Sequence, residues 1–84
     1  RRRATLSASS FRDVVTVPSS STSGWVLRNY VTNCGELRVR IDNDPDVPLA
    51  ADEPLLVQPG ETLQARCSAS PGVTPVGYFM FNEQ

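Results

Sequence analysis

Polar and apolar residues alternate along much of the chain, most cleanly between positions 36 and 42. There Leu37, Val39 and Ile41 share one face, and charged residues occupy the other. An alternation with a period of two is typical of a β-strand that buries one face and exposes the other. Other segments combine β-branched and aromatic residues between turn-forming boundaries. The pattern predicts about six strands, which lie over residues 11–17, 25–32, 36–42, 55–57, 61–68 and 76–82.

No segment carries apolar residues at a spacing of three and four over the length that a helix needs. We therefore expect an all-β fold, a small antiparallel β-sandwich or barrel that is jelly-roll-like in form. Pro59 and Gly60 occupy the second and third positions of a tetrapeptide that is typical of a type II turn. This turn predicts a hairpin between residues 55–57 and 61–68.

The chain has 84 residues, which is room for one domain. Residues 1–10 carry charge and small hydroxyl side chains with hardly any apolar residues, so they predict a flexible basic arm that orders on contact. Residues 11–84 form a single β domain. Within it, residues 42–54 hold three prolines and five acids, which predicts a long irregular excursion. Because burial in so small a domain barely offsets the entropy of ordering, we expect a homo-oligomer, a dimer or trimer.

Composition excludes several classes of chemistry. Histidine is absent, which removes the usual general base at neutral pH and the usual zinc ligand. We therefore expect a protein that is not an enzyme and that uses no cofactor. The net charge of −1 gives no strong attraction to nucleic acid or to an anionic membrane. No apolar run approaches the length of a membrane span, and no apolar stretch follows the amino-terminal arginines, so we expect a soluble, unexported protein.

Two motifs offer alternatives. Cys34 and Cys67 could form one bridge, but thiols of a chain without a secretion signal are more often reduced, and we expect Cys67 to pack as a small core residue. Four acids match positions one, three, five and twelve of a calcium loop, but position six is Val47 instead of glycine, and no helices flank the loop. We therefore expect no metal site and a solvated acidic loop, whose four matching residues are Asp42, Asp44, Asp46 and Glu53.

Candidate partner-binding residues come from the arm and from the tyrosines. Trp25 and Phe81 are expected in the core, because a small domain needs large residues to fill it. Tyr30 and Tyr78 are better surface candidates, since their hydroxyl groups require water or a partner. Three arginines on an arm bind phosphate only weakly, so nucleic acid is not expected, and an acidic neighbouring subunit is the more fitting partner. These arginines are Arg1, Arg2 and Arg3.

The order of these features is more specific than any one of them. The segments TSGWVLRN, GELRVRID, PLAADEPLLV and QPGETL follow one another and lead to a terminal aromatic strand. In this order, residues 11–82 resemble the small β-sandwich proteins of tailed bacteriophage virions, which serve as head-decoration, cement or fibre-base components. The five-acid excursion is longer than is usual in such modules.

The resemblance implies a virion structural protein that is assembled in the host cytoplasm and stabilises the outer surface of a capsid. Its partners would be the major capsid protein or other virion subunits, bound through the arm and through exposed strand edges. The alternative is a small carbohydrate-binding or cell-surface-binding module, such as a fibre or spike component. That module would use Tyr30, Tyr78 and the 42–54 loop.

Overall fold

The fold is all-β, as the alternation predicts. The structure is a computed structural model that describes residues 2–83, apart from the side chain of residue 31. Within this range the chain forms strands and no helix. The eight strands are β1 (Arg2–Thr5), β2 (Arg12–Thr16), β3 (Trp25–Thr32), β4 (Leu37–Ile41), β5 (Val47–Pro48), β6 (Leu55–Val57), β7 (Thr62–Cys67) and β8 (Val76–Glu83).

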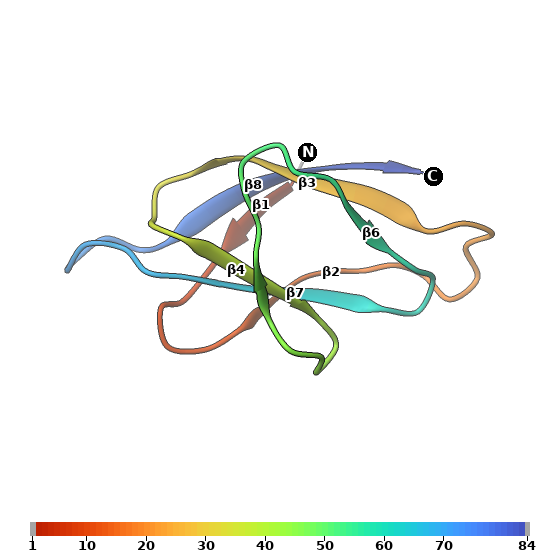
Figure 1. Ribbon diagram of the computed structural model, residues 1–84, viewed down its shortest axis with the longest axis horizontal. Coiled ribbons are helices and arrows are strands. Elements are labelled where there is room, and N and C mark those ends of the chain that lie inside the picture. The colour runs from red at the N-terminus through yellow and green to blue at the C-terminus, as the bar shows by residue number, and fades with distance from the viewer. Residues whose placement is uncertain (1, 84) are drawn as a thin grey trace.

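The strands form two antiparallel sheets that pack face to face as a small sandwich (Figure 1). Sheet A has the strand order β1-β8-β3-β6, and sheet B has the order β2-β7-β4-β5. All the strand pairs within both sheets are antiparallel. The prediction of a small antiparallel β-sandwich is therefore confirmed.

The core lies between the two sheets and is built from alternate residues of each strand. In β4, Leu37 and Val39 are buried, and in β7 the buried position at the strand end is Cys67. Sheet A contributes Leu27 and Phe79, which are both fully buried. The expected alternation and the core position of Cys67 are confirmed. One face of each strand is removed from water, which stabilises a domain of this size.

The turn predicted at residues 58–61 forms, but the hairpin does not. Gly60 has a φ of 86°, and the N–H of Glu61 donates to the carbonyl of Gln58 at 3.0 Å, as a type II turn requires. However, β6 pairs with β3 in sheet A, whereas β7 pairs with β2 and β4 in sheet B. The turn is therefore a crossover between layers, because local turn chemistry sets the chain reversal and not the sheet that each strand joins.

The expectation of a flexible arm over residues 1–10 is wrong for residues 2–6. Residues 2–5 form β1, which pairs with β8, and Ala4 and Leu6 are buried with the core. This segment orders because β8 would otherwise present a row of unpaired backbone N–H and C=O groups. Ala4 and Leu6 add apolar contacts with the core. Arg1 lies outside the described residues.

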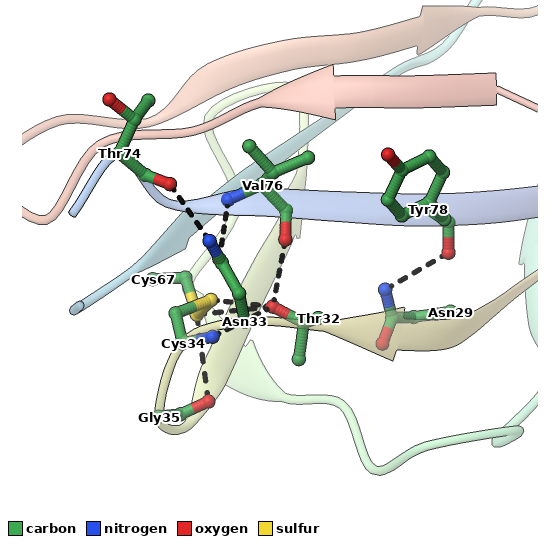
Figure 2. The surroundings of a disulfide bond; sticks show 9 residues. All are labelled: Asn29, Thr32, Asn33, Cys34, Gly35, Cys67, Thr74, Val76 and Tyr78. Atoms are coloured by element: carbon green, nitrogen blue, oxygen red, sulfur yellow. Dashed lines mark hydrogen bonds between the residues drawn. A yellow bond between two sulfur atoms is a disulfide. The ribbon is translucent and has the colours of Figure 1, made fainter.

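The expectation of reduced cysteines is also wrong, because Cys34 and Cys67 form a disulfide (Figure 2). The chain crosses from sheet A to sheet B at residues 33–36, and the N–H of Gly35 donates to the carbonyl of Ser68 at 2.8 Å. This bond places the crossover beside the end of β7, where the two Cα atoms are 5.9 Å apart. That separation is typical of a disulfide. The bond joins the crossover to sheet B.

Candidate functional site

Exposed and half-buried side chains of interface-forming types gather on the outer face of sheet A, which is turned away from sheet B. Arg3 lies opposite Tyr78 in the β1–β8 pair, and Arg28 lies opposite Met80 in the β3–β8 pair. Directly opposed residues project from the same face of a sheet. The sheet A face, as we call it, comprises Arg3, Arg28, Tyr30, Tyr78 and Met80.

A β-bulge brings the two tyrosines together on this face. The β3–β8 register shifts between Asn29 and Val31, so that an extra residue of β3 lies opposite Tyr78. The side-chain amide of Asn29 is buried and donates to the carbonyl of Tyr78 at 3.2 Å, which satisfies a polar group beside the disturbed ladder (Figure 2). Tyr30 then lies beside Tyr78, with ring centroids 6.2 Å apart.

The charge of the sheet A face is positive and unbalanced. Arg3 and Arg28 are exposed, and neither forms an ion pair with any described residue. The five residues of the face include no acid. Next to Arg3 the surface is hollowed by a pocket of about 310 Å³, which is lined by Arg3, Thr32, Asn33, Val76 and Tyr78. An anionic group of a partner would therefore find a free guanidinium on this face.

Three arginines of sheet B, in contrast, are engaged within the chain. Arg38 forms ion pairs with Asp46 at 2.5 Å and with Glu36 at 2.9 Å. The guanidinium carbons of Arg40 and Arg66 lie 4.2 and 5.3 Å from the ring centroid of Phe11. Cation–π and ion-pair contacts thus hold these arginines against their own sheet. The contrast makes sheet A the better candidate for a partner-binding surface.

The predicted cluster of amino-terminal arginines is divided by the strand. Arg3 lies on the sheet A face, as described, whereas Arg2 projects from the other side of β1. One Arg2 nitrogen, Nη1, donates to the carbonyl of Val14 at 3.4 Å, and the guanidinium carbon is 5.8 Å from the Phe81 ring centroid. The structure therefore places Arg3 with Tyr30 and Tyr78 and separates Arg2 from them.

Trp25 and Phe81 lie at the margin of the core. Both are partly buried and pack against the core cluster, with ring centroids 5.9 Å apart. The prediction that they are core residues is correct for the buried side of each ring. Their remaining surface belongs to a pocket of about 320 Å³, which is lined by Arg2, Trp25, Phe81, Asn82 and Glu83.

Acids of the 42–54 loop make contacts that hold the loop in place. A carboxylate oxygen of Asp42 accepts the N–H of Thr62 at 3.1 Å, and one of Glu53 accepts the N–H of Ala50 at 2.9 Å. Asp46 is ion-paired with sheet B, as described. Among residues 2–83, histidine, cysteine and acidic side chains form no group that could hold a metal ion. The loop also contributes to a pocket near Asn29, which neither tyrosine lines.

The Arg38–Asp46 pair predicts a loss of stability in acid. The hydrogen bond from Arg38 lowers the pKa of Asp46 below its ordinary value of 3.8. A lowered carboxyl pKa stabilises the folded state above pH 3.8, and this contribution is lost as the pH falls through the lower pKa of the folded protein. We expect urea unfolding of Asp46→Asn to depend less on pH than that of the wild type between pH 2 and 5.

Asp44→Asn is the matched control for this titration, because Asp44 is exposed and makes no ion pair with a described residue. Its pH profile of unfolding should follow the wild type. A profile of Asp46→Asn that is parallel to the wild type over the whole range would contradict the stabilising role of the pair.

Two residues of the sheet A face were not among the sequence candidates. Arg28 and Met80 join it because β3 and β8 are neighbours in the register that opposes them. Period-two alternation does place each on the side opposite a buried neighbour, Leu27 or Phe79. That signal was available in the sequence, but the pairing of the two strands was not.

Comparison of the chain with protein-family models, with curated proteins and with solved structures found no match in any of the three. Within the described part of the chain there is no helix with the length and apolar character to cross a bilayer. The sheet A face provides two cations that form no ion pair with a described residue, two tyrosine rings in tilted contact and an exposed thioether.

Proposed function

We propose that this chain is a non-enzymatic virion structural protein that binds and stabilises the outer surface of a phage capsid through its sheet A face. The observation that carries the proposal is the gathering of aromatic, methionine and arginine side chains on one uncovered face, where Met80 is 47% exposed. These residue types are enriched at protein–protein interfaces. The partner is a capsid protein or another virion subunit with an acidic surface, which complements the arginines.

The disulfide and the sheet edges support this role. Disulfides persist on virion and cell surfaces and are rare in proteins that remain in a reducing cytosol. The chain would fold and assemble in the host cytoplasm with its thiols reduced, and the disulfide would form in the oxidising surroundings that the released particle meets. The outermost strands of the two sheets, β1 and β6 in sheet A and β2 and β5 in sheet B, offer backbone groups to neighbours. We propose that a dimer or trimer forms through these edges, which leaves the sheet A face for the shell.

Co-sedimentation with capsid shells that were assembled without this chain tests the proposal. We expect the double variant Arg3→Gln/Arg28→Gln to bind roughly tenfold or more weakly, because each loss removes a cation from the centre of the interface. Binding of the wild type should also weaken as salt is raised, since exposed charges are screened. Both arginines are exposed, so the fold is expected to be unaffected.

The matched control is Arg12→Gln, which removes an exposed cation from sheet B and should leave shell binding unchanged. Equal binding by the wild type and the double variant would refute the assignment of the face. Equal weakening by Arg12→Gln would show that net charge, and not this surface, controls the association.

A further inference from the structure

The pocket of Trp25 and Phe81 has the composition of a ligand site and takes no part in the sheet A face. It lies at the end of the sandwich where β3 begins and β8 ends. The two rings are inclined at 51° and are only partly buried, so that they form an apolar wall that remains accessible. An accessible aromatic wall is uncommon in a small domain, which has few large side chains to fill its core.

Polar groups of both signs surround this aromatic wall. The Arg2 guanidinium lies over the Phe81 ring and is positioned by the carbonyl of Val14. Glu83 and Asn82 line the same pocket and are exposed. The pocket thus offers hydrogen-bond donors from a guanidinium and an amide, and acceptors from a carboxylate, with opposite charges that balance.

Backbone groups add to this polar rim. Strand β1 pairs with β8 from Val76 to Phe79, whereas β3 pairs with β8 as far as Glu83. On the β1 side, no described strand pairs with residues 81–83. Backbone N–H and C=O groups of this stretch are therefore available to a ligand beside the aromatic wall.

We infer that this pocket binds a carbohydrate, one pyranose ring stacking on Trp25 and Phe81. The C–H face of a pyranose is apolar and fits an aromatic wall, whereas its hydroxyl groups both donate and accept hydrogen bonds. A carboxylate and a guanidinium satisfy such groups, and their balanced charge favours a neutral ligand over a strongly anionic or cationic one. The volume of about 320 Å³ lies at the lower end of the range for small-molecule sites.

The carbohydrate site differs from the one that the sequence suggests. It uses neither tyrosine and no residue of the 42–54 loop. It also goes beyond capsid binding, because the sheet A face and this pocket share no residue and could be occupied together. A protein on the outside of a particle would in this way carry both a surface for the shell and a site for glycans of a host cell.

Intrinsic fluorescence gives a direct test, because Trp25 is the one tryptophan in the chain. The purified protein is first applied to an array of bacterial polysaccharides and animal glycans, and the glycan with the highest signal is then titrated against tryptophan emission. We expect a saturable change in emission. Glu83→Gln keeps the size of the side chain but removes its charge, and should weaken binding roughly tenfold.

Arg28→Gln is the matched control, because it alters the sheet A face and should leave the glycan titration unchanged. Glu83→Gln should in turn leave co-sedimentation with capsid shells unchanged, so each proposal can fail without the other. The inference is overturned if no glycan on the array binds, or if Glu83→Gln binds the selected glycan as tightly as the wild type. Saturation of the emission change by an extended peptide, with no response to any glycan, would likewise overturn it in favour of strand addition at β8.

Discussion

Replacing both cysteines, Cys34→Ala/Cys67→Ala, is expected to lower the free energy of unfolding by about 3 to 4 kcal/mol. The bond closes a loop between residues that are 33 positions apart, and its loss restores the conformational freedom of that loop to the unfolded chain. Small domains have a stability of only about 5 to 15 kcal/mol, so the effect is a large fraction of the total. Urea unfolding of the variant and the wild type, at equal pH and temperature, measures it.

Reducing agent provides the control for this comparison. Dithiothreitol should lower the urea midpoint of the wild type toward that of the double alanine variant, and it should not change the variant itself. If reduction leaves the wild-type midpoint where it was, the bond contributes nothing to stability. The orientation of the crossover would then rest on its hydrogen bonds alone.

Phe79→Ala is expected to destabilise the protein by about 3 to 5 kcal/mol, because Phe79 is fully buried and its removal leaves a cavity between the sheets. The adjacent Met80 projects from the opposite face and is 47% exposed, so Met80→Ala should cost less than about 0.5 kcal/mol. Denaturant unfolding of the two variants compares neighbouring positions of one strand.

Phe79→Leu keeps the experiment informative if the alanine variant does not fold. Leucine retains most of the apolar volume, so this variant should remain folded with an intermediate loss of stability. A cost of Met80→Ala equal to that of Phe79→Ala would show that the inward and outward faces of β8 have been assigned the wrong way round.

Alternation predicted the strands well because it depends only on which face of a strand is removed from water. Leu37 and Val39 face the core for that reason, and the turn at Gly60 forms because its positive φ depends on local chemistry. The partner of each strand is a different matter. The 55–57 and 61–68 segments separate into two sheets, which depends on how both layers pack and is not encoded in a turn.

Segments with few apolar residues were predicted less well. Residues 2–5 form a strand because β8 supplies a complete set of backbone partners, and a single buried alanine in β1 is enough. Likewise, no spacing rule pairs Cys34 with Cys67, since they meet only after the chain crosses between sheets. In both cases the deciding neighbour is remote in the sequence.

In the candidate site, too, residue types could be predicted from the sequence, but their spatial neighbours could not. Arginine and tyrosine were selected by type, and Arg3, Tyr30 and Tyr78 do share one face. Arg2 was grouped with Arg3 because they are adjacent in the chain, but adjacent residues of a strand project to opposite sides. The Trp25 pocket was not anticipated, because the sequence cannot show which side of a large ring is left uncovered at the end of a sandwich.

The arrangement of the strands has a consequence for the folding rate. Except for the β4–β5 pair, each pairing joins strands that are not consecutive along the chain, and β1 must find β8. Closing such long loops before any contact stabilises them makes folding slow, on a scale of milliseconds to seconds for β-sandwiches. Until β1 docks, the edge of β8 is open to another nascent chain. Dilute conditions during refolding should therefore favour the monomeric sandwich over aggregates.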